Sequence, residues 1–375
     1  MNKAIRLVMA AGAILGGTAF SPASAESAWT YDSEAKTLSE VVQEGTAWVF
    51  NVSVTAAGTT IVSVNESGSG TTIDLSAAAV RSVCPPIVEI GIGVFNNLVH
   101  ENKFAFSAFV FPETLKTIGE GAFRSCNLAV VDLSATEVAS IGIAAFNGNA
   151  ALTTLRLPET LTTIGIDAFT SCTSLQSVEP CFPAALSSIG MTAFTYCPIT
   201  NALVLSNPGL KKLATNTGYG LFVGSKFPSI DLSLSGIESI EQGTFGGGNT
   251  ELTTVSLPPT LTYLGWDAFA LCSNLKNVDF RSLPTFHEYA FGNAMNLPAR
   301  FTIDREDKAW LDFIAQSTAA GTFHKWKDAS VTDDQRAAYR NMFPGEKTPL
   351  GWLNIGYTDR WIVPRPRPGM AVLVY

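Results

Sequence analysis

The stretch Leu152–Cys172, which reads LTTLRLPETLTTIGIDAFTSC, decides the fold of this chain. Its first half alternates apolar and polar side chains at Leu155, Arg156 and Leu157, and this alternation predicts a short strand with one buried face. Pro158 should end that strand, because proline has no N–H to donate to a neighbouring strand. The first half therefore contributes a strand whose leucines point inward and whose arginine points outward.

The second half of the stretch turns the chain back. Leu161 and Ile164 direct apolar side chains inward again. Gly165 follows, and we expect glycine here because the backbone has to turn in a way that a Cβ would hinder. Phe169 then completes a tight turn or 3₁₀ segment with its ring in the interior. One coil thus consists of two short inward-facing segments and one buried ring.

The phrase around Phe169 recurs along the chain. Its phenylalanine returns after 22 to 28 residues, and a period of this length is typical of a solenoid. One coil cannot bury its own apolar side chains, so stacked coils must share a core, and nine phrases predict about nine coils. Weaker copies of the phrase end at Phe222, Phe245, Phe269 and Phe291. The phenylalanines expected in the repeat core are Phe123, Phe146, Phe169, Phe194, Phe245, Phe269 and Phe291.

The N-terminal residues have the pattern of a signal peptide. Lys3 and Arg6 precede an apolar stretch at 7–19, and Ala23 and Ala25 stand where a signal peptidase reads small side chains. We expect cleavage after residue 25 and an exported chain, whether extracellular, at the cell surface or periplasmic. The alternative is a short apolar helix that stays attached. No later segment holds eighteen apolar residues in a row, so no transmembrane segment is predicted.

The mature chain divides into three parts. Residues 26–74 alternate like strands and predict a small β cap, the solenoid spans 75–303, and a C-terminal capping domain spans 304–375. Charge supports the second boundary, since 26–303 holds 12 basic and 23 acidic residues whereas 304–375 holds 10 and 9. Because nucleic acid attracts basic surfaces, an acidic solenoid disfavours it as a partner.

The C-terminal cap is predicted to mix helices and strands, with helices at 304–316 and 332–343. Trp310, Leu311 and Ile314 should share one face of the first helix. Thr332 and Gln335 form a capping-box pattern at the start of the second. Four tryptophans fall in this part and are either core of the cap or an exposed sugar-binding platform: Trp310, Trp326, Trp352 and Trp361.

Six cysteines are present, and four of them stand three residues after a repeat phenylalanine. Their spacing follows the repeat, and because no CxxC pair occurs we expect no metal site and no cofactor. Cys172 and Cys197 occupy neighbouring coils, which leaves open either a disulfide or a ladder of small buried thiols. The four repeat cysteines are Cys126, Cys172, Cys197 and Cys272.

These residues resemble the BspA-like leucine-rich repeat family, whose repeat reads L-x-x-I-x-I-P and then, after a polar step, I-G-x-x-A-F-x-x-C. Leu152–Cys172 and Leu252–Cys272 match it almost throughout, and the resemblance covers about 75–303. It implies a leucine-rich-repeat solenoid in a secreted or cell-surface protein of host-associated or community-living microbes. Such proteins attach to host proteins or other cells and are not catalysts. The copies around Phe95 and Phe222 are irregular, and the copy ending at Phe291 lacks the glycine.

Catalytic signatures are absent from the sequence. The three histidines, His100, His287 and His324, have no motif partner, and no H-E-x-x-H, G-x-S-x-G or P-loop occurs. We therefore expect no enzyme.

The middle residue of each L-x-L strand should project outward and form a charge ladder along the stack. The candidate binding residues of this ladder are Asp132, Arg156, Glu179, Asp231 and Asp279, with Val204 and Ser256 between them. A second outward row is mostly hydroxylated: Thr117, Ser140, Thr163, Ser188, Lys212, Ser239 and Tyr263. Either these rows are a solvated sheet face, or the acidic one attracts a basic protein segment, or divalent cations together with it, in a salt-sensitive manner.

Three functions fit the sequence. The first is a non-enzymatic adhesion protein that binds a protein partner in a host matrix or on another cell. The second is a structural scaffold of the cell envelope, and the third is a carbohydrate-binding module that uses the tryptophan-rich C-terminal part.

Overall fold

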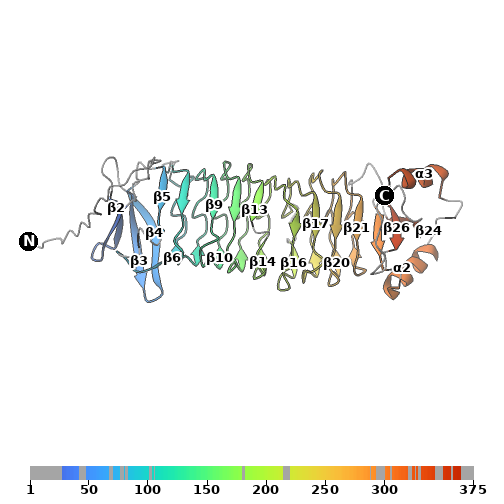
Figure 1. The fold of residues 1–375 in the computed structure, drawn as a ribbon, viewed down its shortest axis with the longest axis horizontal. Coiled ribbons are helices and arrows are strands. Elements are labelled where there is room, and N and C mark those ends of the chain that lie inside the picture. Colours follow the sequence, from blue (N-terminus) through green and yellow to red (C-terminus); the bar gives the residue numbers. More distant parts are fainter. Residues whose placement is uncertain are drawn as a thin grey trace, which may run out of the picture.

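The computed structural model describes residues 28–364, except for gaps at 42–47, 67–70, 77–79, 81–82, 101–103, 105, 180–181, 214–219, 288, 293–299, 305, 320–322, 326, 328–330, 343–348 and 356–357. The predicted signal peptide and the last residues of the chain lie outside this part. The described chain is an elongated rod in which two rows of short strands run along opposite sides (Figure 1). The predicted solenoid, of about nine turns, is confirmed.

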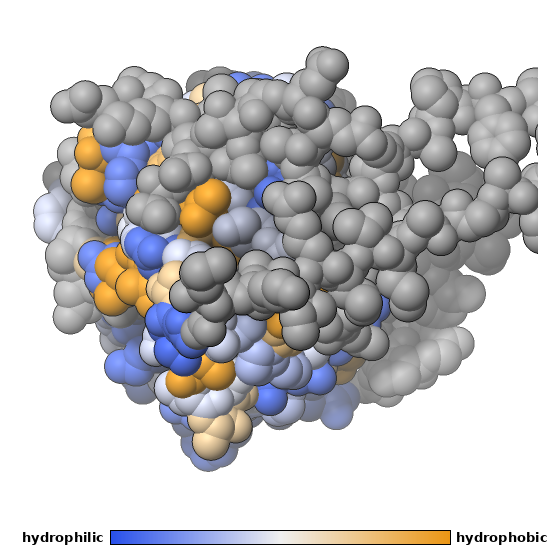
Figure 2. Space-filling model, turned by 90° about the vertical axis from the view of Figure 1, so that its left-hand side faces the viewer, coloured by the Kyte–Doolittle hydropathy of each residue, from blue (hydrophilic) through white to orange (hydrophobic). Residues whose placement is uncertain are grey.

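The N-terminal end is an antiparallel meander that continues into the solenoid. Strands β1 (Ala28–Asp32), β2 (Thr37–Val41), β3 (Val49–Thr55) and β4 (Gly58–Glu66) pair in sequence order, and β4 then pairs in parallel with the first coil. Trp29 and Trp48 are buried against Phe50, so the meander covers the apolar end of the first coil. On this end, the described residues show hydrophilic and hydrophobic side chains intermixed (Figure 2).

The two rows of strands follow from the two inward-facing segments of each coil. One row extends the meander in parallel register through β6 (Ile87–Ile90), β8 (Thr117–Ile118), β10 (Ser140–Ile141), β12 (Thr163–Ile164) and β14 (Ser188–Ile189). The other row begins with β5 (Thr72–Asp74) and β7 (Ala108–Val110), followed by β9 (Val130–Asp132), β11 (Thr154–Arg156) and β13 (Ser177–Glu179).

In the second half of the solenoid, both rows continue as new sheets. One holds β16 (Lys212–Leu213), β18 (Ser239–Ile240), β20 (Tyr263–Leu264) and β22 (Thr285–Phe286). The other holds β15 (Leu203–Val204), β17 (Ser229–Asp231), β19 (Thr254–Ser256), β21 (Asn277–Asp279) and β23 (Arg300–Ile303), and continues through β26 (Thr358–Pro364), β25 (Gly351–Ile355) and β24 (Phe323–Lys325).

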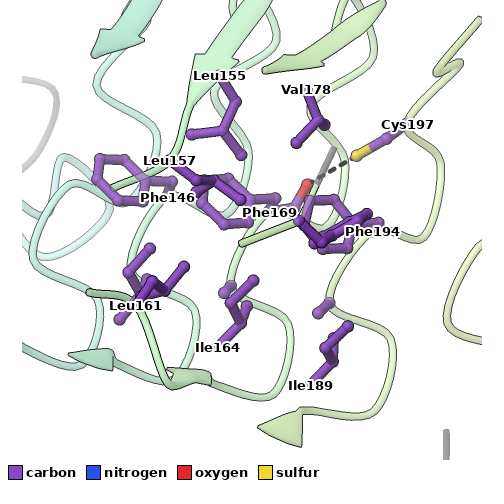
Figure 3. Packing of buried hydrophobic residues seen from close by; sticks show 14 of the residues in the cluster. Phe146, Leu155, Leu157, Leu161, Ile164, Phe169, Val178, Ile189, Phe194 and Cys197 are labelled. Carbon is purple, nitrogen blue, oxygen red and sulfur yellow. Dashed lines mark hydrogen bonds between the residues drawn. The ribbon is translucent and has the colours of Figure 1, made fainter. Parts of the chain in front are cut away.

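The repeat phenylalanines form one column in the interior. Phe146 and Phe169 stack with ring centroids 5.3 Å apart and planes 5° from parallel, and Phe169 and Phe194 do so at 5.2 Å and 10° (Figure 3). Six of the seven predicted core phenylalanines have no exposed surface, and Phe291 is 4 % exposed. Fully burying one such side chain contributes roughly 1.5–3 kcal/mol. The column therefore supplies much of the apolar core that single coils lack.

The repeat glycine has a different role from the one expected. Gly165 does not adopt a positive φ; instead, a Cβ there would lie 2.5 Å from the carbonyl carbon of Gly142 in the preceding coil. The left-handed residue comes two positions later, at Asp167, with a φ of 57°. The glycine is thus required because two backbones approach closely, and the turn itself is made by a residue that carries a side chain.

The repeat cysteines are free and buried, so the disulfide alternative for Cys172 and Cys197 is excluded. Each thiol donates to the carbonyl oxygen of the phenylalanine in the preceding coil, as Cys197 does to Phe169 at 3.1 Å (Figure 3). Burial raises the pKa of the Cys272 thiol to about 12, which keeps it protonated as a donor. The thiol ladder is therefore part of the hydrogen bonding between coils.

Both strand rows are interrupted between the coils of Phe194 and Phe222, and one row is interrupted also between β7 and β9. Between the coils of Phe194 and Phe222, β13 and β15 belong to different sheets, as do β14 and β16. The Asn201 side chain substitutes for strand pairing, since its amide donates to the carbonyl of Val178 at 3.2 Å and accepts from the N–H of Val178 at 3.5 Å. The ring spacing also widens to 5.7 Å. We call this place the joint.

The C-terminal end contains the two predicted helices. Helix α2 (Lys308–Ala319) begins later than expected because the Asp307 carboxylate accepts the N–H of Ala309 at 2.8 Å and caps it. The prediction that Leu311 belongs to the apolar face of this helix is wrong, since Leu311 is 47 % exposed, whereas the adjacent Trp310 is buried. Helix α3 (Asp333–Met342) has the predicted capping box, with reciprocal bonds of 2.8 and 3.1 Å between Thr332 and Gln335.

Candidate interaction surface

The first half of the charge ladder neutralises itself. Strands β9, β11 and β13 pair in parallel, with Arg156 directly between Asp132 and Glu179. The guanidinium lies 3.2 Å from Asp132 Oδ2 and 3.3 Å from Glu179 Oε2, and all three side chains remain about half exposed. The register of the predicted ladder is thus present, but its acidic character is reduced here, because one cation serves two carboxylates.

The second half of the ladder is arranged differently. Strands β15, β17, β19 and β21 align Val204, Asp231, Ser256 and Asp279 in register. Asp231 is exposed, accepts the N–H of Ser233 at 2.9 Å and forms no ion pair within the described residues. Asp279 lies 3.7 Å from Arg281, which stands two residues after the end of β21, and the Asp279 side chain is 17 % exposed. No cation stands between the two aspartates on this face, where Ser256 occupies the intervening position.

The opposite row of hydroxyl side chains is aligned as predicted, but it is less available. Ser239 keeps the register of the row with Lys212 and Tyr263, but it is only 8 % exposed and donates to Glu241 at 2.8 Å. Directly before three of these strands, a further hydroxyl bridges neighbouring coils, as Thr162 does to the carbonyl of Ala139 at 2.8 Å and Thr262 to that of Glu238 at 2.9 Å. Much of the hydroxyl content of this face therefore serves the stack itself.

The repeat pattern, the parallel ladders and the phenylalanine column agree with one family. The model of the BspA type leucine rich repeat region, present in six copies, matches residues 90–217 and 182–298. The chain belongs to this family. No curated protein matches the sequence.

Several solved structures resemble this BspA-type chain. A leucine rich cell surface protein from Faecalibacterium prausnitzii is 19 % identical, with a TM-score of 0.37 over 70 % of this chain and 89 % of that one. A leucine rich repeat protein from T. pallidum is 18 % identical, with a TM-score of 0.33 over 80 % and 95 %. The pneumococcal vaccine antigen PcpA is 15 % identical, with a TM-score of 0.33 over 72 % and 94 %.

In the BspA-type chain, Asp132 and Arg156 of the first half of the ladder shift each other's pKa values. Burial raises the pKa of Asp132, but the hydroxyl and N–H of Ser134 and the charge of Arg156 outweigh it, so that the pKa of this carboxyl is lowered. Hydrogen bonds to Asp132 and Glu179 and the charges of these two carboxylates raise the pKa of Arg156. The three charges of the first half of the ladder are thus paired with one another.

The tryptophans do not support a sugar platform in the part of the C-terminal cap that is described. Trp310 has no exposed surface and packs against Phe280 and Phe313, with ring centroids 5.3 and 5.7 Å away. Trp326 and the side chains of Trp352 and Trp361 lie outside the described residues. Trp266 in the solenoid is 48 % exposed instead. The sequence could have indicated it, because it stands at an outward position of the repeat phrase.

Among the described residues, no group of three or more histidine, cysteine, aspartate or glutamate side chains could hold a metal ion. Within the same residues, neither helix has both the length and the apolar character needed to span a bilayer.

Proposed function

We propose that this protein is an exported, non-enzymatic adhesion protein that binds a basic segment of a partner protein. The binding surface is the strand face formed by Val204, Asp231, Ser256 and Asp279, together called the open ladder. Membership of the BspA-type family supports a protein-binding role. The pattern of basic and then apolar residues at 3–19 supports export.

The observation that carries the proposal is the contrast along one sheet face. Arg156 compensates Asp132 and Glu179 at 3.2 and 3.3 Å, whereas the exposed carboxylate of Asp231 has only a backbone N–H as partner among the contacts described. An exposed sheet face kept polar for solubility would not need this asymmetry. A basic partner would supply to the open ladder the charge that Arg156 supplies to the first half.

The test is binding of a lysine–serine repeat peptide to the mature chain, measured by fluorescence anisotropy. Asp231→Asn combined with Asp279→Asn should weaken binding roughly threefold to tenfold at about 0.1 M salt, and less at high salt because screening removes the attraction. The matched control combines Asp132→Asn with Glu179→Gln and should change affinity less. Equal binding by the wild type and the Asp231/Asp279 variant at low salt would overturn the proposal. Unchanged melting temperatures would show that both variants are folded.

A further inference from the structure

Trp266 stands out among the outward residues of the repeat phrase. It follows Gly265 directly, two residues after β20, in the strand row opposite β19 and β21 (Figure 1). The same position in other coils is exposed or half-buried, and its occupants there are aliphatic or polar: Ile92, Glu120, Ile143, Ile166, Met191 and Gln242. Because every described residue at this position points outward, the indole of Trp266 lies at the surface, away from the core.

The next coil holds this indole from one side. His287 stacks on Trp266 with ring centroids 5.4 Å apart and planes only 2° from parallel, and Tyr289 lies 5.8 Å from both rings. His287 occupies the position of the repeat glycine, where most coils tolerate no side chain. Its Nδ1 accepts the N–H of Tyr289 at 3.2 Å, which fixes the ring. Despite these contacts, Trp266 remains 48 % exposed.

No aromatic ring of the preceding coil stacks on the indole within the described residues. The N–H of Gly243 in that coil donates to the carbonyl of Trp266 at 2.8 Å, and Gln242 occupies the position equivalent to Trp266. Both ring partners of Trp266 among the described residues, His287 and Tyr289, belong to the following coil, and the indole keeps an exposed surface. A flat group could therefore stack there.

A carboxylate accompanies the indole. Asp267 has a φ of 53°, and its equivalent one hundred residues earlier, Asp167, has a φ of 57°. The Asp167 carboxylate is occupied, since it accepts the hydroxyls of Thr170 at 3.0 Å and Thr192 at 2.6 Å. The positions of those two hydroxyls are taken by Ala270 and Tyr289 around Asp267.

The surroundings of Asp267 leave its charge only partly compensated. Burial raises the pKa of this carboxyl, while the nearby His287 and a hydrogen bond from the Trp266 side chain lower it. No ion pair to lysine or arginine within the described residues involves Asp267. The carboxylate thus retains acceptor capacity beside an open indole.

We propose that Trp266 and Asp267 bind an arginine side chain of a partner protein. A guanidinium is flat and cationic, so it can stack on the indole and donate two parallel N–H bonds to the carboxylate. Lysine has a point charge and lacks this geometry. Tryptophan and arginine are also the residues most enriched at binding hot spots. This site is separate from the open ladder, and either can fail without the other.

The experiment uses the mature chain labelled with 5-fluorotryptophan and observed by fluorine NMR. Among the seven tryptophan resonances, the Trp266→Phe variant identifies the one to follow. The probes are three blocked peptides that alternate glycine with arginine, lysine or citrulline. We expect the Trp266 resonance to shift with the arginine peptide, less with the lysine peptide, and not with the citrulline peptide.

Matched variants separate this site from simple charge attraction. Asp267→Asn should weaken the arginine-peptide effect about tenfold, because a hydrogen bond to a charged group is lost. Asp167→Asn, at the equivalent but occupied position, should leave it unchanged. The Asp231→Asn and Asp279→Asn variant should retain the Trp266 shift, which distinguishes this site from the open ladder.

Three results would overturn the assignment. The first is an equal shift of the Trp266 resonance with the arginine and citrulline peptides, which would show that the charge of the peptide plays no part in binding. The second is an Asp267→Asn variant that binds like the wild type. The third is a Trp266 shift with chitohexaose or maltohexaose but not with the arginine peptide, which would make the indole a sugar platform.

Discussion

The coils of Phe123 to Phe194 and those of Phe222 to Phe291 are built from the same phrase but use their surfaces differently. In the first group Arg156 bridges Asp132 and Glu179. In the second, Ser256 stands between Asp231 and Asp279, and Trp266 extends outward on the opposite side. Both groups keep a stacked phenylalanine column, at 5.2–5.3 Å in the first and 5.2–5.5 Å in the second.

The difference shows that the core and the surface of the solenoid are under separate constraints. The inward positions repeat because each ring must stack on its neighbours, and any coil that failed to do so would interrupt the core. The outward positions touch only the adjacent rungs and the solvent, so they can vary. The joint separates the two groups, and each strand row ends there. Within the described residues, Arg156 pairs with two carboxylates in the first half, whereas in the second half Asp231 has no ion pair and Asp279 pairs with Arg281.

The largest expected effect tests whether the joint is also an energetic boundary. Phe169→Ala removes a fully buried ring and should cost about 3–5 kcal/mol in the free energy of unfolding. Because coils interact only with their neighbours, the loss of local stability should be largest in the coils before the joint. Hydrogen exchange measured by mass spectrometry should accelerate more in residues 90–200 than in 222–291. Phe245→Ala is the control and should reverse the pattern. Uniform acceleration along the whole rod would contradict a boundary.

A smaller effect on stability is expected from glycine-to-alanine substitutions, which test how closely the coils stack on the two sides of the joint. A Cβ at Gly165 would lie 2.5 Å from Gly142 C, whereas the nearest atom for a Cβ at Gly265 is Gln242 N at 2.8 Å. Since backbone atoms cannot move aside easily, Gly165→Ala should destabilise by about 1–3 kcal/mol. Gly265→Ala should cost less, and His287 already shows that the last coil accepts a side chain there. Urea unfolding of both variants measures the difference, and equal costs would mean equal stacking.

The smallest expected effect comes from removing Arg156, which leaves the first half of the ladder without its central cation, as in the second half. Arg156→Ala should lower the melting temperature by no more than about 2 °C, because exposed ion pairs contribute little. It should also strengthen binding of the lysine–serine peptide roughly threefold at low salt, since Asp132 and Glu179 lose their cation. Weaker binding would show instead that Arg156 itself contacts the partner.

The pH dependence of the same variant provides a second check. The pKa of Asp132 is lowered in the folded chain, so its contribution to stability is present above the unfolded pKa of about 3.9 and is lost as the pH falls through the folded value. The difference in melting temperature between wild type and Arg156→Ala should therefore shrink below about pH 4. A difference that persists in acid would point to packing by the arginine stem.

Most of the fold was predictable because it depends on local, repeated features. The positions of Phe169 and Leu155 follow from periodicity alone, and the capping box at Thr332 and Gln335 follows from spacing. The role of Gly165 was not predictable, since it depends on how closely the preceding coil approaches. The start of α2 was also misplaced, because either Asp304 or Asp307 has a suitable side chain for a cap.

The sequence by itself determined the stacked coils, the buried column and the direction in which each outward residue points. These depend on alternation and period, which are properties of a single coil. Only the tertiary structure decided which charges meet, that the cysteines act as free thiol donors, and that His287 and Tyr289 support Trp266. The reason is physical: contacts between rungs join residues more than twenty positions apart, and their register and spacing exist only once the coils have stacked.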